Sequence, residues 1–142
     1  MNKFYPTLLL ALLLLAPLAS CQQKPAPSTE TSQALAAEKT TVLYFHGKQR
    51  CITCRAIEKY AQEVVKALPP EQVEMRIIDI TAPANQTLVS QYKVSWSSLF
   101  LVKGGKSVDL TKMAFQYAKP NPDTFKKKLT AEIHKLEAAL SK

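Results

Sequence analysis

The fold is decided by one stretch of the chain, residues 41–68, which reads TVLYFHGKQRCITCRAIEKYAQEVVKAL. Its first part, residues 41–46, is rich in β-branched and aromatic side chains and predicts a buried strand. In residues 53–68 apolar side chains recur at helical spacing, which predicts an amphipathic helix that ends at a pair of prolines. Cys51 and Cys54 lie where the expected strand gives way to the expected helix.

The two cysteines form a Cys-x-x-Cys pair at the beginning of that helix. Free backbone N–H groups and the positive end of the helix dipole favour a negatively charged sulfur at such a position. Because the thiolate is the nucleophile in disulfide exchange, the pair indicates redox chemistry. The alternative is a structural disulfide, but so short a spacer closes too small a loop to stabilise the fold much.

Basic residues surround the pair. Lys48, Arg50 and Arg55 place positive charge near Cys51, and we expect them to lower its pKa; the alternative is a solvated basic loop. His46 lies at the end of the expected strand. We expect it to form hydrogen bonds in the loop, with a role as general base or metal ligand as the alternative.

The N-terminal segment reads as an export signal. Lys3 supplies a positive charge, and the leucine-rich residues 8–15 are too short an apolar run to span a bilayer. Leu18-Ala19-Ser20-Cys21 then resembles the lipobox of bacterial lipoprotein precursors, in which the cysteine receives lipid and becomes the mature N-terminus. We therefore expect lipidation at Cys21, the alternative being an ordinary secretory signal with a chance cysteine. In both cases the chain is exported.

Composition divides the chain into three parts. Residues 1–20 form the signal peptide, residues 21–39 predict a lipidated flexible tether rich in Pro, Ser and Thr, and residues 40–142 have the size of one small domain. The formal net charge is +8, and Lys3 is the only charged residue of the signal, so the mature chain would carry +7. An exported, tethered protein rarely meets nucleic acid, so we expect a solvated basic surface and no nucleic-acid partner.

The other expected elements follow in a definite order. The pattern predicts strands at residues 73–80, 98–102 and 107–110, a short helix capped by Asn85, a glycine hairpin turn at residues 103–106 and a last helix that starts at residues 121–123. We expect Phe115 and Tyr117, between the hairpin and the last helix, to be core residues. The order βαβαββα predicts an α/β fold with a mixed central sheet and helices on both faces.

This order, with Cys-x-x-Cys at the first strand-to-helix junction, resembles the thioredoxin fold. The stretch of residues 92–106 is similar to the thioredoxin segment that enters the third strand and its hairpin. More narrowly, the chain resembles a bacterial family labelled as a nitrophenyl compound nitroreductase subunit, on Phe45-His46-Gly47, residues 51–58 and Leu110-Thr111 with Ala114-Phe115. The resemblance implies a three-layer thioredoxin-like lipoprotein with a dithiol site. The chain has no glycine-rich nucleotide motif, and we expect no cofactor.

The resemblance also implies roles for residues at the dithiol. Cys51, nearer the end of the helix, is the attacking thiolate, and Cys54 resolves the mixed disulfide. Tyr44 or Phe45 occupies the position of the buried aspartate that relays protons in thioredoxins, so that relay is missing here.

The loop before the third expected strand also differs from that of thioredoxins. Trp96, Ser97 and Ser98 occupy the loop that docks substrate, and Ser97 replaces the cis-proline of thioredoxins. Because a cis bond at a non-proline residue is costly, we expect a trans bond at Ser97. The polar neighbours of Trp96 favour an exposed contact for a partner over a buried anchor.

Three functions fit these features. The leading hypothesis is a thiol–disulfide oxidoreductase, lipid-anchored to a membrane through Cys21 and facing the periplasm, which exchanges disulfides with exported proteins and with a redox partner protein. The second is a module that holds Cu(I) or zinc through the two thiolates and His46. The third is a non-catalytic subunit that uses the fold as a docking surface. We expect no resident metal.

Overall fold

The structure, a computed structural model, describes residues 39–140. Its strands are β1 (Thr40–His46), β2 (Val73–Asp79), β3 (Ser98–Lys103) and β4 (Lys106–Asp109). Its helices are α2 (Ile52–Lys66), α3 (Gln86–Gln91), α4 (Thr111–Tyr117) and α5 (Pro122–Leu140), with a 3-10 turn η1 (Pro83–Asn85) before α3.

The expected signal peptide, the lipidated Cys21 and the tether up to residue 38 lie outside the described residues. Within residues 39–140, none of the helices is long and apolar enough to cross a membrane.

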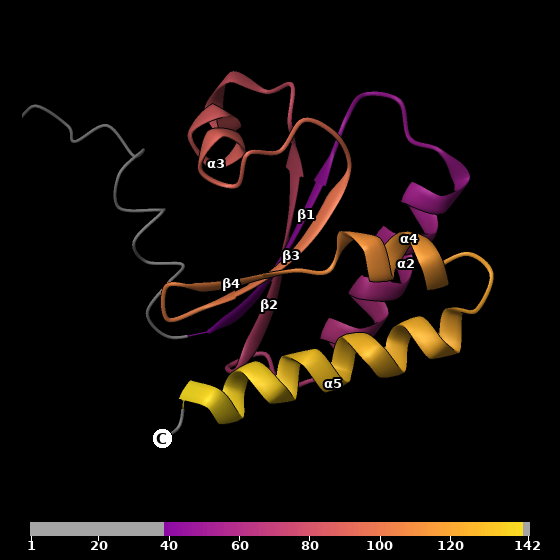
Figure 1. The fold of residues 1–142 in the computed structure, drawn as a ribbon, viewed down its shortest axis with the longest axis vertical. Helices are drawn as coiled ribbons and strands as arrows, with labels where there is room; N and C mark the ends of the chain where they lie inside the picture. The colour runs from indigo at the N-terminus through magenta and orange to yellow at the C-terminus, as the bar shows by residue number, and fades with distance from the viewer. Residues whose placement is uncertain (1–38, 141–142) are drawn as a thin grey trace, which may run out of the picture.

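The four strands form one mixed sheet in the order β2-β1-β3-β4 (Figure 1). The central strand β1 runs parallel to β2 and antiparallel to β3, and Tyr44 pairs with Ile77 on one side and with Leu99 on the other. β4 returns from β3 as an antiparallel hairpin. The α2 crossover makes the first pair of strands parallel, and the short turn makes the last pair antiparallel. The α/β, thioredoxin-like fold class expected from the sequence is confirmed.

Helices cover both faces of the sheet, and each face has its own core. In Figure 1, α2, α4 and α5 lie together on one side and α3 lies on the other. Successive side chains of β1 point to opposite faces, so Val42 and Tyr44 join the larger core while Leu43 and Phe45 join the smaller one. A strand buried on both faces must be apolar throughout, which explains the continuous hydrophobic run that begins the deciding stretch.

Two turns show how local sequence directs the chain. Gly104 and Gly105 both have positive φ, as a tight hairpin between right-twisted strands requires. The expectation that the Asn85 side chain caps the short helix is wrong, because it forms no capping hydrogen bond with α3. Its Nδ2 instead donates to the carbonyl oxygen of Asp79 at 2.9 Å and closes the loop after β2.

Helix α4 was not expected from the sequence. Its N-cap, Leu110, forms no side-chain hydrogen bond, and it spans two turns only. Its start is marked by Asp109 alone, whose carboxylate accepts a hydrogen bond from the Thr111 amide at 2.8 Å. It is fixed by Thr111, whose Oγ1 accepts a hydrogen bond from the Leu99 amide at 3.0 Å. The expectation that Phe115 belongs to the core is wrong, because α4 leaves this side chain 39% exposed.

Candidate dithiol site

The site begins with Cys51, which is the N-cap residue of α2 and is exposed. Its Sγ accepts a hydrogen bond from the Cys54 amide at 3.1 Å, in the manner of an ordinary capping side chain. A hydrogen bond with the Cys54 side chain lowers the pKa of the Cys51 thiol, and backbone N–H groups of Cys54 and Thr53 act in the same direction. The sequence thus places an accessible sulfur where the chain's own amides stabilise its charge.

Cys54 lies one helical turn further and is buried, with 5% of its surface exposed. The two free cysteines therefore lie close together but differ in access to solvent. Only Cys51 can be reached by a large partner, and Cys54 can act on whatever is attached to Cys51.

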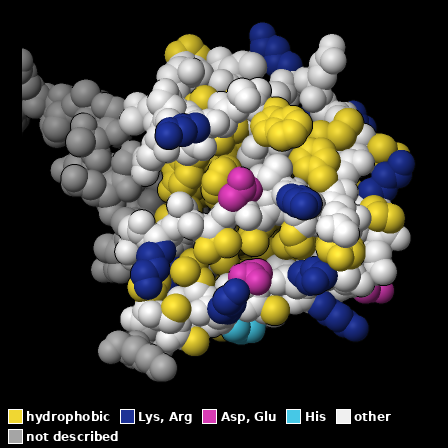
Figure 2. All heavy atoms as spheres, in the orientation of Figure 1, with side chains coloured by type: hydrophobic (Ala, Val, Ile, Leu, Met, Phe, Trp, Pro, Cys, Tyr) yellow, Lys and Arg dark blue, Asp and Glu magenta, His cyan; other side chains and the backbone are white. Residues whose placement is uncertain are grey.

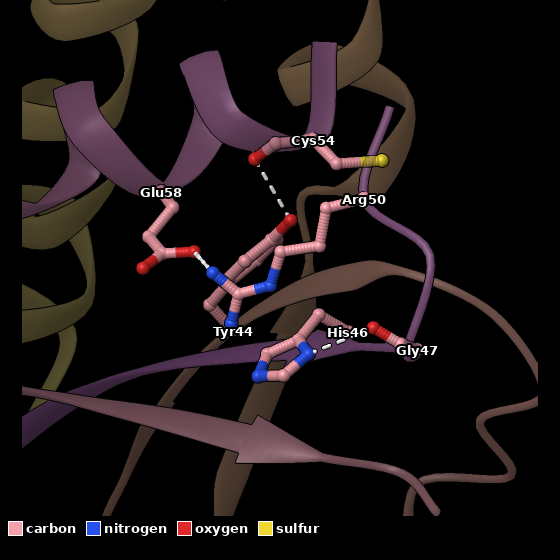
Figure 3. A network of polar contacts seen from close by, with 6 residues as sticks. All are labelled: Tyr44, His46, Gly47, Arg50, Cys54 and Glu58. Atoms are coloured by element: carbon pink, nitrogen blue, oxygen red, sulfur yellow. Dashed lines mark hydrogen bonds and ion pairs between the residues drawn. The ribbon is translucent and has the colours of Figure 1, made fainter. Parts of the chain in front are cut away.

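The three flanking cations differ in their surroundings. The Arg50 guanidinium forms an ion pair with Glu58 (Figure 3), and Arg55 and Lys48 are exposed. The influences that lower the Cys51 pKa are hydrogen bonds of its own helical turn, against a smaller opposing effect of burial, and these charges are not among the main causes. That the cations tune Cys51 stays a prediction. Arg50 has a clear structural task, because its ion pair ties the loop before Cys51 to the second turn of α2.

Tyr44 forms the floor of the site, a role that we did not expect from the sequence. Its side chain is fully buried, and its hydroxyl donates to the Cys54 carbonyl oxygen at 2.8 Å. Figure 3 shows that carbonyl facing Tyr44 while the Cys54 sulfur points away from it. Burial raises the pKa of Tyr44 well above its ordinary value, and a hydrogen bond with Ser97 acts in the opposite direction. The only signal in the sequence was one phenolic hydroxyl within the apolar part of the strand.

His46 lies at the end of β1 and is half-buried. Its Nδ1 is 3.0 Å from the Gly47 carbonyl oxygen, and its ring centroid is 6.2 Å from that of Tyr44 (Figure 3). The expected hydrogen bond within the loop is thus present. Among residues 39–140, no group of three or more His, Cys, Asp or Glu side chains is placed to hold a metal ion.

The loop that precedes β3 lies beside this floor. Ser97 is half-buried, while Ser98 is buried and its hydroxyl donates to the Trp96 carbonyl oxygen at 3.2 Å. Every peptide bond between residues 39 and 140 is trans, as expected for Ser97. Trp96 is 69% exposed, which confirms the exposed interpretation. Its ring is stacked on that of Phe115, with centroids 6.5 Å apart and planes inclined by 19°.

A groove of about 510 Å³ opens next to this aromatic pair. We call it the aromatic groove, and its apolar lining consists of Tyr92, Val94, Trp96, Phe100 and Phe115. Figure 2 shows hydrophobic side chains gathered on this face, between α3 and α4, with basic and acidic side chains among them. The groove was not predicted, because its walls come from four separate elements.

Comparisons with known proteins give only distant similarity. No protein-family model matches the chain, and the comparison with curated proteins finds no match. Among solved structures, a thioredoxin of Fasciola hepatica is 25% identical, covering 56% of this chain and 73% of its own, with a TM-score of 0.44. Thioredoxin O1 of Arabidopsis thaliana, in its oxidized state, is 23% identical over 62% of this chain and 87% of its own, with a TM-score of 0.45. A structure titled as a malarial protein is 18% identical over 55% of this chain and 93% of its own, with a TM-score of 0.40. The fold assignment rests on the strand order described above.

Proposed function

We propose that this protein is a thiol–disulfide oxidoreductase, tethered to a membrane of the bacterial cell envelope, that exchanges disulfides with exported proteins through Cys51 and Cys54. One observation carries the proposal. An exposed sulfur caps α2 and receives the amide hydrogen bond of Cys54, whose own thiol is buried one turn away. A nucleophile with a lowered pKa beside a protected second thiol is the arrangement that two-step disulfide exchange needs.

The reaction follows from this difference in access. The Cys51 thiolate attacks one sulfur of a partner disulfide, and the other partner sulfur leaves as a thiolate. Cys54 then loses its proton and attacks the Cys51 sulfur, which releases the second partner sulfur. Two electrons pass from the dithiol to the partner, and a Cys51–Cys54 disulfide remains. The reverse sequence oxidises a partner dithiol, and the difference in reduction potential sets the direction.

Surrounding residues hold the first turn of α2 in place for both steps. Tyr44 binds the Cys54 carbonyl from below, and the ion pair of Arg50 with Glu58 fixes the loop that leads to Cys51. Trp96, Ser97 and Ser98 would contact the partner backbone, as the resemblance to thioredoxins implies. The exposed Ile52, 67% accessible beside Cys51, adds an apolar contact for the same partner.

Trapping of intermediates tests the dithiol. In a Cys54→Ser variant the mixed disulfide cannot be resolved, so exported partners should accumulate on Cys51 and appear as reducible adducts on non-reducing gels. A Cys51→Ser variant is the matched control and should trap far fewer partners, because Cys54 is buried. Equal trapping by the two variants would contradict the assigned roles. A reduction potential of the pair, measured in glutathione buffers, then gives the direction of electron flow.

The anchor is a separate part of the proposal and rests on the lipobox-like sequence. Residues 1–20 would be removed, Cys21 would carry the lipid, and residues 21–39 would let the domain reach partners. Labelling with a lipid precursor should mark the wild type and not a Cys21→Ala variant. Lipid incorporation that persists in the variant would refute this part alone, because the dithiol reaction does not depend on it.

A further inference from the structure

The aromatic groove is large enough to hold part of another molecule. Its volume of about 510 Å³ lies within the range of ligand-binding sites, about 300–1,000 Å³. Trp96 and Phe115 present stacked faces at its rim although burial would be more favourable for both. Exposed aromatic residues beside a groove are typical of binding surfaces, where they supply contact area with few rotatable bonds.

Lys93, which lines the groove, adopts a backbone conformation that its residue type disfavours. Its φ is 52°, and it is the only residue other than glycine with positive φ in the described part of the chain. It follows the end of α3, where the Val94 amide binds the Val89 carbonyl oxygen at 2.9 Å and the Lys93 amide binds that of Ser90 at 3.2 Å. Glycine is the usual residue at this position of a helix end. No ion pair within residues 39–140 compensates for the lysine, which indicates a task outside the fold.

The charges of the groove point to an anionic occupant. Lys93 and Lys112 line it and are exposed, and neither has a carboxylate partner in the described residues. The one acidic lining residue, Asp109, accepts a hydrogen bond from the Thr111 amide at 2.8 Å and keeps its negative charge, so the two lysines leave the lining with a net charge of +1. Two unpaired cations therefore face whatever binds over the aromatic surface, and opposite charge on the partner would be favoured.

The groove adjoins the dithiol. Ser98, two residues after Trp96, pairs with Phe45 on β1, and the hydroxyl of the adjacent Tyr44 binds the carbonyl of Cys54. A partner whose disulfide reaches Cys51 can therefore extend its neighbouring residues into the groove.

We propose that the aromatic groove binds a segment of the partner protein in which an aromatic residue is flanked by acidic residues. The aromatic side chain packs against Trp96 and Phe115, and the carboxylates meet Lys93 and Lys112. The inference deepens the proposed function, because it names the class of partner that the oxidoreductase selects. The binding step itself needs neither cysteine.

Three blocked peptides without cysteine or tryptophan test the proposal with the full-length chain in detergent. The first has a phenylalanine between glutamates, the second a phenylalanine between lysines, and the third an alanine between glutamates. Trp96 is the single tryptophan of the chain and lies in the groove, so its fluorescence reports binding directly. We expect only the first peptide to bind appreciably, and its affinity to fall as salt screens the charges.

Variants of Lys93 separate recognition from folding. Lys93→Gly and Lys93→Asn both suit a positive φ and remove the charge, so each should lower the affinity for the first peptide about threefold to fivefold. Lys93→Gly should leave the melting temperature of the protein unchanged or raise it, because glycine suits the positive φ at this position. Lys119→Gly, which removes an exposed lysine outside the groove, is the matched control and should leave the affinity unchanged.

Equal binding of the three peptides, or undiminished affinity in both Lys93 variants, would overturn the proposal. A variant with both Cys51→Ser and Cys54→Ser should still bind the acidic aromatic peptide. If the wild type binds the acidic aromatic peptide but exchanges no disulfide, the proposed function is refuted and the binding role of the groove still holds. Exchange without peptide binding would refute the groove alone.

Discussion

Replacement of Tyr44 by phenylalanine should destabilise the protein by about 1 kcal/mol, the net contribution of one buried hydrogen bond. The hydroxyl is fully buried and donates to the Cys54 carbonyl at 2.8 Å. That carbonyl lies in the first turn of α2, where it also faces the amide four residues further along the helix. It therefore keeps one hydrogen-bond partner when the Tyr44 hydroxyl is removed. The ring remains and leaves no cavity, which keeps the cost near this value.

Circular dichroism during urea and thermal unfolding measures the effect. For a domain of this size 1 kcal/mol corresponds to a fall of about 4–8 °C in the melting temperature. Tyr60→Phe is the matched control, because Tyr60 is only partly buried, packs against the same core and forms no hydrogen bond through its hydroxyl with any of residues 39–140. We expect the control to change stability by less than about 0.5 kcal/mol. Equal losses in the two variants would refute the role of the hydrogen bond.

The pH dependence gives a second, independent readout. Because burial raises the pKa of Tyr44 in the folded state, an unfolded chain ionises this residue first, near pH 10. The wild type should therefore lose stability as the pH rises above about 10, while a phenylalanine at this position cannot contribute to that loss. The stability difference between wild type and variant should narrow in strong alkali. A difference that stays constant from pH 8 to 11 would mean that Tyr44 ionises equally in both states.

Three further outcomes are expected. In a Cys54→Ala variant the pKa of Cys51, followed by the rate of alkylation against pH, should rise toward the ordinary value because its principal hydrogen-bond partner is lost. The pKa of Asp79 lies below its ordinary value because Thr81 donates to it through its amide and its hydroxyl, so Thr81→Val should raise that pKa partway in an NMR titration. Gly105→Ala should cost about 1 kcal/mol in urea unfolding, because φ is +75° there although a Cβ would meet no atom.

A control or a contradicting result accompanies each outcome. Gly47→Ala introduces the same methyl group into equally open space at an ordinary φ, and should be neutral or slightly stabilising. An unchanged Cys51 pKa without the Cys54 side chain would shift the explanation to the backbone amides of the first turn or to the flanking cations. A full return of the Asp79 pKa to its ordinary value in Thr81→Val would mean that the amide contributes nothing.

Elements that depend on residues close together in the sequence were predictable. The continuous apolar run of β1, the helical spacing after Cys54 and the paired glycines of the hairpin each specify an element, and all three elements form. The two cysteines were also expected at the start of this helix, but the helix begins at Ile52, one residue earlier than predicted, and this makes Cys51 its N-cap.

Features that depend on contacts distant in sequence were not predictable. Helix α4 spans two turns only and is held by β3 through Thr111, so its one local start signal, the Asp109 carboxylate that accepts from the Thr111 amide, did not suffice to predict it. Phe115 was therefore misplaced in the core. Asn85 has the right residue type for a cap, but the Asp79 carbonyl offers its side chain another partner. Likewise, no local sequence pattern indicates that the Tyr44 hydroxyl donates a hydrogen bond to the Cys54 carbonyl oxygen.

The order of the strands has a consequence for solubility. β2 and β4 lie at the two sides of the sheet, and within residues 39–140 no strand pairs with their outer edges. Such edges offer free N–H and C=O groups to a second molecule and invite aggregation by strand addition. β4 is only four residues long and mostly exposed, while β2 alternates apolar residues with Glu74 and Arg76. The charged residues of β2 and the short length of β4 oppose the addition of further strands and so oppose fibre formation. Neutral substitutions at Glu74 and Arg76 should therefore increase the turbidity of the solution on heating without altering the core.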